Sequence, residues 1–549
     1  MKQLLKSHPA FAASLIMLAA MTPLMILRDF TPANELRYLS IADEAIRDGH
    51  VFAFTNQGEA YADKPPLYFW LIMAMRLVFG GHSIFALSLL SFIPALVIIG
   101  VMDKWVVQES SRHSLISAFS ERFASALMLG TSALFIGTAV FLRMDILMCM
   151  FIVLAMYSFY RMYVNSGNWK LHSYLLPLYI FLALFTKGPV GLLLPPLAIL
   201  VFLLSEGKLR DTFKYLGWKT WGIIAGLCAV WFTGVWIDGG TSYLENLLFH
   251  QTVDRAVNAF HHKEPFWYYF MVIWYIIAPY SLLLIFGLAA SFLTKGYRNV
   301  SARLYASVVI TAFVMMSSFS SKLAIYLLPI FPFLVYLFSV QSGRFEKSWW
   351  IKILLAIPSL IFVLAGLLAV AALSLYGKVP QLAALMESYC FVLSPFTYIA
   401  ISFLILGGCF SLWFIFRGND WSRPVISIAV SMLACVFAAS PMVPEANDFI
   451  GYANLCKAAG QMASESGTEC RFVTLFVSRS ENMDVYLGED IVSYGRDPGE
   501  YLSSDIGDHI LMVKTSHIAE NQELVSRLHE LPYRQVGDYR CYYVKSGSN

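Results

Sequence analysis

The sequence predicts an α-helical, polytopic membrane protein that ends in a small α/β domain. Of its 549 residues, 58% are hydrophobic and 14% are charged, against roughly 25% charged in ordinary soluble domains. Apolar runs long enough to cross a bilayer recur from residue 10 to residue 441. After Pro444 the composition changes to short β-type runs and stretches with helical period. We therefore predict a transmembrane domain over residues 1–443 and a separate domain over residues 444–549.

The overall charge favours a membrane partner over a nucleic acid. The net charge of +3 is close to neutral for a chain of 549 residues, so no nucleic-acid partner is expected. The 13 Trp and 29 Tyr residues are typical of aromatic belts at the membrane interface. The N-terminal run has basic residues in front of it, as a signal peptide does. Its length and the absence of a small-residue cleavage site before Arg28 favour a retained first helix.

Thirteen apolar runs have spanning length. They are residues 10–27, 84–102, 124–142, 146–163, 171–186, 189–204, 220–237, 266–292, 304–319, 323–340, 351–376, 395–416 and 423–441. The run over 66–80 is short, contains Arg76 and follows two prolines, so we interpret it as an interfacial helix beside the membrane. That choice decides on which side every later loop lies.

Basic residues then fix the predicted orientation. With the N-terminus in the cytoplasm, the inner loops include residues 206–219, 293–303, 341–350 and 417–422, and each carries or adjoins Lys or Arg, as the positive-inside rule requires. Counting 66–80 as a span would place these loops outside. The sequence thus predicts a protein of the inner (plasma) membrane with a cytoplasmic N-terminus and an extracytoplasmic C-terminal domain.

The first predicted outer loop, residues 28–83, carries the densest charge near the N-terminus. Asn34-Glu35-x-Arg37-Tyr38 places a carboxylate, a guanidinium and a phenol within one helical turn. Residues 40–49 then predict a short surface helix stopped by glycine. Asp63-Lys64-Pro65-Pro66 follows, where the prolines fix the backbone and present the acid and the amine from a rigid turn. The simpler interpretation is a charged loop that only tethers two helices.

These motifs resemble a known family. NExRY followed by DKPPLYFW is similar to the first outer loop of the GT-C class of membrane glycosyltransferases. The resemblance is to the bacterial branch that contains the lipid A aminoarabinose transferase and the protein O-mannosyltransferase-like enzymes, with the pattern DExRYA followed by EKPPLxYW. It implies thirteen transmembrane helices and a polyprenyl-phosphate-linked sugar donor.

Other charged residues are expected at the same outer face. They come from turns and loops between later runs: Arg143, Asp145, Lys187, His250, Arg255, His261, His262, Lys263 and Lys322. Each alone is also explained as a snorkelling anchor, but their gathering at one face favours a site at the outer membrane boundary. Cations there suit a phosphate headgroup, and carboxylates suit a general base or a metal.

The resemblance assigns roles to particular residues. It implies that Lys64, Arg255 and Tyr326 hold the carrier phosphate, with Arg37, Tyr38 and Lys322 as further substrate-binding candidates. Asp63 and His250 match the pair that binds a divalent metal, with zinc the expected ion, and His262 is the rival ligand. The family has Asp where this chain has Asn34, so the catalytic candidates are Asn34, Glu35 and Asp145, with the base role passing to one of the two acids.

The predicted function is transfer of a sugar from a polyprenyl-phosphate donor to a cell-envelope acceptor, with lipid A or a related glycolipid favoured. A protein O-glycosyltransferase of the same class and a lipid or ion transporter are the alternatives. A transporter would favour two internally similar halves with charges near the midplane, which the sequence does not show. Four of the eight cysteines lie in segments expected outside, where disulfides form: Cys390, Cys456, Cys470 and Cys541.

Overall fold

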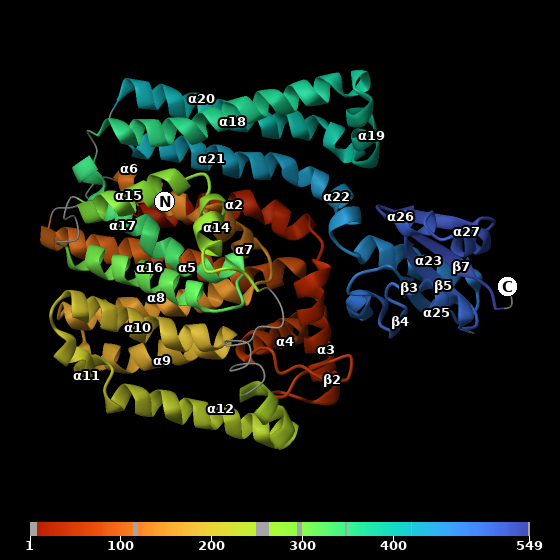
Figure 1. Ribbon diagram of the computed structural model, residues 1–549, viewed down its shortest axis with the longest axis horizontal. Helices are drawn as coiled ribbons and strands as arrows, with labels where there is room; N and C mark the ends of the chain where they lie inside the picture. The colour runs from red at the N-terminus through yellow and green to blue at the C-terminus, as the bar shows by residue number, and fades with distance from the viewer. Residues whose placement is uncertain are drawn as a thin grey trace. The chain divides into compact units, whose positions relative to one another are not determined.

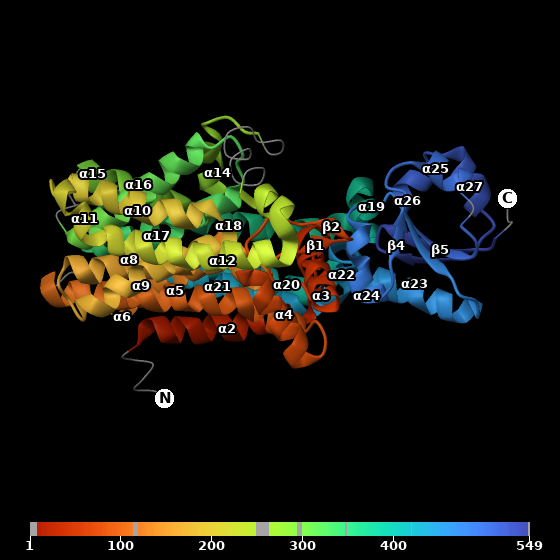
Figure 2. The ribbon, with the colours of Figure 1, turned by 90° about the horizontal axis from the view of Figure 1, so that it is seen from below.

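The computed structural model describes residues 8–113, 119–248, 263–293, 299–345, 348–418, 420–504 and 506–546 (Figures 1 and 2). The chain divides into two compact units. The first, here the helical unit, comprises Met1–Pro23, Tyr61–Tyr68 and Phe85–Ala439; the second, here the mixed unit, comprises Leu24–Ala60, Phe69–Ile84 and Ser440–Asn549. Residues from the first predicted outer loop thus group with the C-terminal residues, and the predicted boundary at residue 443 stays a prediction.

The helical unit is a set of packed helices. They are α2 (Pro9–Leu27), α5 (Ile84–His113), α6 (Phe119–Gly130), α7 (Ala133–Val140), α8 (Met144–Tyr163), α9 (Trp169–Lys187), α10 (Pro189–Ser205), α12 (Trp218–Glu245), α14 (Tyr268–Ile276), α15 (Ser281–Leu293), α16 (Val300–Ser318), α17 (Ile330–Phe345), α18 (Trp349–Leu375), α20 (Pro395–Arg417) and α21 (Ser422–Ala439), with shorter helices that include α11 (Thr212–Tyr215) and α19 (Pro380–Ser388). Helix α20 packs between α18 and α21, and α9 packs between α8 and α12. In Figure 1, α18, α20 and α21 form one edge of this unit and α12 the other.

Each of the thirteen predicted runs falls on one or two of these helices. Among the described residues, eight helices are long and apolar enough to cross a membrane, or nine if the bent pair α6 and α7 is one span. Helices α10 and α15 are also apolar, but they are shorter, with 17 and 13 residues. The chain is therefore a multi-pass membrane protein, and the count of thirteen spans stays a prediction.

Two of the predicted runs are interrupted, and hydrogen bonds connect the two breaks. Helices α6 and α7 meet at an angle of 66°, and the run over 266–292 is divided into α14 and α15. The Thr131 hydroxyl lies 2.8 Å from the Tyr280 hydroxyl, and the backbone N–H of Ala133 donates to the carbonyl of Ala278 at 2.9 Å. Backbone groups released by a break need new partners inside a membrane, and here each break supplies partners to the other.

Charged groups lie at both ends of α8. Asp145 is at its start. At its last residue, the Tyr163 hydroxyl donates to Glu206 at 3.0 Å, and Glu206 in turn pairs with Arg303 at 2.6 Å. A helix of 20 residues is about 30 Å long, close to the thickness of a bilayer core. The predicted outer charges of α8 and the predicted inner loop over 206–219 therefore lie at opposite ends of one helix.

The mixed unit begins at the end of α2. It continues with a π-helix (η1, Pro32–Leu36), α3 (Arg37–Asp48), β1 (Thr55–Asn56) and β2 (Glu59–Ala60), and it includes most of α4 (Leu67–Phe79). Helix α3 ends as the sequence predicts, because Gly49 takes a left-handed conformation with φ of 79° that glycine adopts without strain. The predicted helix over 66–80 is present as α4.

The C-terminal part of this unit is a mixed sheet covered by helices. The helices are α22 (Val443–Ile450), α23 (Ala453–Ser466), α24 (Asp484–Leu487), α25 (Pro498–Ser503), α26 (Thr515–Ile518) and α27 (Gln522–Leu528). The strands are β3 (Arg471–Leu475), β4 (Ile491–Ser493), β5 (His509–Lys514), β6 (Tyr533–Val536) and β7 (Tyr539–Val544), in the order β4-β3-β5-β7-β6. Strands β4, β3 and β5 are parallel, and β7 and β6 are antiparallel to their neighbours.

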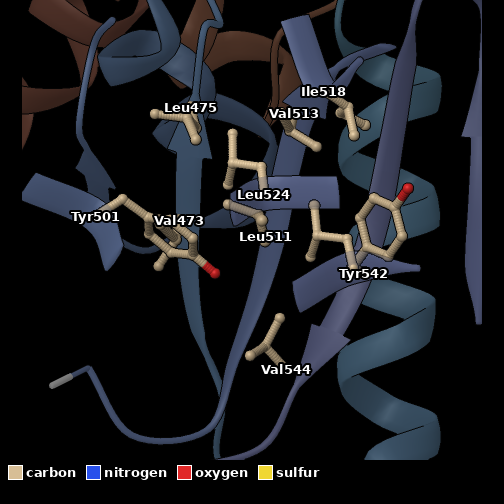
Figure 3. Packing of buried hydrophobic residues seen from close by; sticks show 10 residues of the cluster. Val473, Leu475, Tyr501, Leu511, Val513, Ile518, Leu524, Tyr542 and Val544 are labelled. Atoms are coloured by element: carbon tan, nitrogen blue, oxygen red, sulfur yellow. The ribbon is translucent and has the colours of Figure 1, made fainter. Parts of the chain in front are cut away.

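The core of this α/β part lies on one face of the sheet. Leu511 pairs with Val473 on one side and Tyr542 on the other, so the three side chains point to the same face. They pack with Leu524 and Ile518 from the covering helices, as Figure 3 shows. Helix α23 packs on β5, β6 and β7. The predicted strands over 471–478, 490–495, 509–514 and 539–545 are confirmed, and β6 is an addition.

Asp29 joins the two ends of the sequence within the mixed unit. Its carboxylate accepts hydrogen bonds from the backbone N–H of Phe30 and of Ala453 at 2.7 and 2.8 Å, and from the Tyr486 hydroxyl. Its own N–H donates to Asn447. A Cβ on Gly451 would lie 2.0 Å from this carboxylate, so only glycine fits there. The segment after α2 is thus built into the C-terminal α/β part.

All eight cysteines lie within the described ranges and are free thiols. Cys456 and Cys541 are buried in the mixed unit, where burial raises the pKa of both thiols, that of Cys541 to about 12. These thiols stay protonated and unreactive.

Candidate active site

The turn at Asp63-Lys64-Pro65-Pro66 is fixed through the residues that follow it. The Tyr68 hydroxyl lies 3.0 Å from the Ser91 hydroxyl. Ser91 also accepts a hydrogen bond from the N–H of Arg143 at 3.0 Å and lies 3.2 Å from its carbonyl oxygen. The two prolines and this chain of hydrogen bonds hold Lys64 in a set relation to the turn before α8.

A second turn, between α9 and α10, positions Lys187. Gly188 has φ of 110° and ends α9. A Cβ on Gly191 would lie 2.3 Å from the carbonyl carbon of Ala183, so the two helices approach as closely as glycine allows. Pro189 then occupies the first position of α10, where a missing N–H costs nothing. The two glycines and the proline of the sequence Lys-Gly-Pro-Val-Gly thus make this tight turn.

Lys187 lies at the centre of a group of charges in the helical unit. Its ammonium forms an ion pair with Asp145, whose side chain is buried, whereas the Lys187 side chain is 14% exposed. The same ammonium lies 5.0 Å from the centre of the Tyr326 ring, a distance at which a cation and an aromatic ring attract. The positive charges of Lys64 and Arg143 act on Lys187. We call Lys64, Arg143, Asp145, Lys187 and Tyr326 the cation cluster.

The cation cluster contains three of the residues predicted from the sequence, namely Lys64, Asp145 and Tyr326. Arg143 and Lys187 were expected at the same face without an assigned role. Three half-buried cations near one another strongly favour an anion as ligand. Tyr326, in the short helix η5 (Ala324–Leu327), adds an aromatic ring and a hydroxyl. The arrangement fits a phosphate group beside a carboxylate.

Lys322 lies close to this region in sequence, but its contacts are with the backbone. Its ammonium donates to the carbonyls of Glu264 and Phe319 at 2.8 and 2.5 Å, and the residue is buried. These bonds tie residues 263–264 to residues 320–321, which also form a β-bridge. They favour a structural role for Lys322, and its predicted contact with substrate stays a prediction.

Glu35 and Arg28 form a closed pair in the mixed unit. Two guanidinium nitrogens of Arg28 donate to the two oxygens of Glu35, each at 2.8 Å. The carboxylate also accepts from the N–H and the hydroxyl of Thr31 at 2.8 and 2.9 Å, and its side chain is 0% exposed. Such bidentate, charge-assisted contacts are among the strongest in proteins. Sequence reasoning missed this pairing because Arg28 stands seven residues away, outside the NExRY motif.

The remaining residues of that motif also lie in the mixed unit. The carbonyl of Asn34 accepts the N–H of Arg37. The Arg37 guanidinium lies 6.0 Å from the ring centre of Tyr38, and Tyr38 is buried edge-on against Phe69, with ring centres 5.7 Å apart. The π-helix that carries Asn34 and Glu35 is a rare form that occurs often at functional sites.

A third group of charges lines a cleft of about 460 Å³ in the mixed unit. Asp43 accepts hydrogen bonds from Arg76 at 3.0 Å and pairs with His82 at 2.8 Å. Burial raises the pKa of Asp43, but the hydrogen bonds and charges of His82 and Arg76 outweigh it, so the net shift is downward. Burial raises the pKa of Asp484 across the cleft, and hydrogen bonds from Ser40, the Val485 N–H and Gln57 offset only part of that rise.

The predicted metal pair is only partly described. Asp63 is half-buried, whereas His250, its rival His262 and the predicted phosphate ligand Arg255 lie outside the described residues. Within the described ranges, no group of three or more His, Cys, Asp or Glu side chains is placed to hold a metal ion. A metal held by Asp63 and His250 stays a prediction, and no chemical step is derived from it.

The fold and the cation cluster together define a class: multi-pass membrane proteins that carry a half-buried cationic site at one end of a set of helices. Comparison with known proteins narrows this class. Residues 63–236 match the family model for dolichyl-phosphate-mannose-protein mannosyltransferase. The matched segment begins at Asp63 and contains four of the five residues of the cation cluster, all but Tyr326.

Curated relatives are similar at low identity. An uncharacterized protein of Aquifex aeolicus is 24% identical over 346 residues, which cover 63% of this chain and 65% of that protein. The undecaprenyl phosphate-alpha-4-amino-4-deoxy-L-arabinose arabinosyl transferase of Edwardsiella ictaluri is 25% identical over 357 residues, covering 62% of this chain and 60% of that enzyme. The matches thus span somewhat less than two thirds of these relatives' lengths.

Solved structures show the same fold over almost the whole chain. ArnT from Cupriavidus metallidurans, crystallised with undecaprenyl phosphate, superposes with a TM-score of 0.70 over 97% of both chains at 16% identity. Its apo form gives a TM-score of 0.68. The predicted fold class and the resemblance to the aminoarabinose-transferase branch of the GT-C glycosyltransferases are therefore confirmed.

Proposed function

We propose that this chain is a membrane glycosyltransferase that moves a sugar from a polyprenyl-phosphate donor to a cell-envelope acceptor. The observation that carries the proposal is the cation cluster, a half-buried group of three cations with one carboxylate and a tyrosine in an ArnT-like fold. The name of the relative from Edwardsiella ictaluri supports an undecaprenyl-phosphate donor. Lipid A or a related glycolipid is the favoured acceptor, following the sequence resemblance.

The donor side of the reaction follows from the cations. As the bond between the sugar and the phosphate breaks, negative charge grows on the phosphate. Cations that are already in position stabilise this charge, and no side chain or solvent has to rearrange during the reaction. Lys64 supplies a point charge from the rigid proline turn, and Arg143 stands on the turn that Ser91 pins. Arg255 is the further phosphate ligand that the sequence resemblance implies. Because these cations stabilise the leaving phosphate, no general acid is needed.

The acceptor side needs a base or an oriented attack. Asp145 is the better candidate for the base because it stands within the cation cluster, next to the proposed phosphate position. Glu35 already accepts hydrogen bonds from Arg28 and Thr31 on both oxygens, so its contacts favour holding the fold of the NExRY motif. Asn34 carries no charge and would take an orienting role.

A second acceptor class is supported by one observation. The matching family model describes protein mannosyltransferases, so transfer to a Ser or Thr of an exported protein is the alternative within the same reaction class. A lipid or ion transporter is the alternative outside it. The metal remains part of the proposal: Asp63 with His250 would provide two ligands, and zinc bound by two side chains would keep positions open for phosphate oxygens.

The proposal is tested by deleting the gene and comparing lipid A, other glycolipids and exported glycoproteins by mass spectrometry. Loss of one sugar from lipid A or a glycolipid supports the favoured acceptor, and loss from proteins supports the alternative. The purified protein should then transfer that sugar from its polyprenyl-phosphate form, with and without a chelator. A deletion strain with an unchanged envelope, together with no transfer by the purified protein, would refute the enzyme.

The same proposal places the site at the outer face of the inner membrane. A reporter fused after Asn549 should then report an extracytoplasmic location, and one fused within residues 206–219 a cytoplasmic location. The structure separates Asp145 from this loop by the length of α8, which supports placing the proposed site and the loop on opposite sides of the membrane. The reversed pair of signals would contradict the orientation.

A further inference from the structure

Resting on the proposed function, we infer that Lys187 is a further ligand of the carrier phosphate and that Asp145 occupies its place until the phosphate arrives. In the structure, the Lys187 ammonium is paired with the Asp145 carboxylate. When the donor binds, its phosphate replaces Asp145 as the partner of Lys187. The Asp145 carboxylate is then free to accept a proton from the acceptor, so donor binding is coupled to activation of the base.

The charges around Lys187 support this exchange. A half-buried ammonium is stabilised by a counter-ion, and the structure pairs it with the Asp145 carboxylate. The positive charges of Lys64 and Arg143 also act on Lys187, so three cations lie near this one carboxylate. A phosphate bound by Lys64 would therefore add negative charge close to Lys187.

The geometry of the two turns makes the exchange local. Asp145 lies in the first turn of α8 and Lys187 is the last residue of α9, and these helices pack side by side. Lysine carries its charge on a flexible stem of four carbons, and the Tyr326 ring, 5.0 Å from the ammonium, offers a second attractive contact during the move. No helix has to shift, because only one side chain changes its partner.

The chemical step balances with Asp145 as the proton acceptor. An electron pair of the acceptor oxygen forms the bond to the anomeric carbon of the sugar. The bond from that carbon to the phosphate oxygen breaks, and its electron pair stays on the phosphate, which leaves as polyprenyl phosphate with one more negative charge. The proton of the acceptor hydroxyl passes to the Asp145 carboxylate. The Lys187 ammonium stabilises the added negative charge on the phosphate while the Asp145 carboxylate is neutralised by the proton.

Binding of undecaprenyl phosphate to the purified full-length protein in nanodiscs tests the exchange apart from catalysis. Asp145→Asn removes the competing carboxylate, so it should tighten binding by about 10-fold, one opposite charge at a partly buried site being worth on the order of 1 kcal/mol or more. Lys187→Met should weaken binding by about 10-fold or more. The Asp145→Asn change is informative because general damage to the site would weaken binding.

A second buried ion pair in the helical unit provides the matched control. Arg122 donates two hydrogen bonds to Asp103, at 2.8 and 2.5 Å, and belongs to no proposed site. Asp103→Asn should leave binding of undecaprenyl phosphate unchanged. Melting temperatures of all variants identify any that fail to fold, and Lys187→Arg, which keeps the charge, should retain binding within a few fold.

The outcomes separate the two proposals. A wild-type protein that binds no undecaprenyl phosphate overturns the proposed function itself. Wild-type binding that Asp145→Asn leaves unchanged or weakens, in a folded variant, overturns the exchange and leaves the proposed function standing. Wild-type binding that Asp145→Asn tightens and Lys187→Met weakens supports both.

Discussion

The cation cluster and the Arg28–Glu35 pair both bring basic and acidic side chains together, but the charges around the two ion pairs differ. Arg28 and Glu35 meet one to one, and Thr31 completes the carboxylate's hydrogen bonds. At Lys187, one carboxylate partner stands among three cations. An ion pair that meets one to one stabilises the fold, whereas cations gathered around a single carboxylate attract an anionic ligand. An ion pair alone therefore does not identify a site; the other charges around it do.

The largest expected effect on sugar transfer comes from a change in the cation cluster. Lys64→Ala should abolish sugar transfer, because the growing charge on the phosphate loses a fixed cation. The protein should still be present in the membrane, since substitutions outside the packed core seldom cost more than ~0.5 kcal/mol. Transfer by purified protein and the amount of protein in membranes provide the two measurements. Near-normal transfer would remove Lys64 from the site.

The comparison itself is tested by making one chemical change in each region. Asp145→Asn should lower transfer by ~10²-fold or more, the usual scale for a positioned base, and should destabilise the fold less than Glu35→Gln does, because the Lys187 side chain left behind is 14% exposed. Glu35→Gln should instead destabilise the fold by ~3–5 kcal/mol, because Arg28 is left buried without its partner. Transfer rates and thermal unfolding are measured for both.

A double variant supplies the control for Glu35. Arg28→Met together with Glu35→Gln removes both charges and should restore most of the stability, because a buried pair is costly mainly when half of it is removed. Should Glu35→Gln be stable and inactive, Glu35 would be the base and the contrast drawn here would be wrong.

Asn34→Asp has a smaller expected effect. It restores the family's acid beside the closed pair, and we expect transfer to be unchanged or raised. Asn34 is half-buried, and its carbonyl, which accepts the Arg37 N–H, is unaltered by the change. Transfer by this variant is compared with the wild type at equal protein amounts. A fall of ~10²-fold would mean that Asn34 itself orients the acceptor.

The sequence predicted the helices and several residues of the cation cluster well, because apolar runs and short charged motifs are local features of the sequence. The apolar runs fall on helices, and the short β-type runs over 471–478 and 509–514 contain strands β3 and β5. The breaks at Thr131 and Tyr280 were not predictable, because their cause is a contact between residues 149 positions apart. The Arg28–Glu35 pair was missed for a related reason: a motif shows which residues recur together, and it does not show which side chain neutralises which.

The smallest expected effects concern the acidic cleft of the mixed unit. Asp43 has a lowered pKa, so the folded state binds fewer protons than the unfolded state there. Its contribution to stability is present above pH ~4, near the unfolded pKa, and is lost as the pH falls below that value. Asp43→Asn should lower the stability at pH 7 by ~1 kcal/mol or less and reduce the loss in acid.

Asp484 should show the opposite sign. Its pKa is raised, so its charged form disfavours the folded state, and stability is gained as the pH falls through the raised value. Asp484→Asn should therefore raise the melting temperature slightly at pH 7 and flatten the profile above pH ~4. Thermal unfolding between pH 7 and pH 3 tests both variants. Parallel profiles for the two would contradict the assigned directions.

The hydrogen bonds of Asp29 also set an order of events during synthesis. Asp29 and its partner Tyr486 are 457 residues apart, and ribosomes add about 5–20 residues per second. The segment after α2 therefore leaves the ribosome roughly 20 to 90 s before the strands and helices that will surround it exist. For that interval a carboxylate destined for burial stands exposed at the membrane. The segment around Asp29 acquires its hydrogen-bond partners only when the last hundred or so residues have been made. A chain that stops early therefore lacks both the C-terminal α/β part and the contacts that hold the segment after α2.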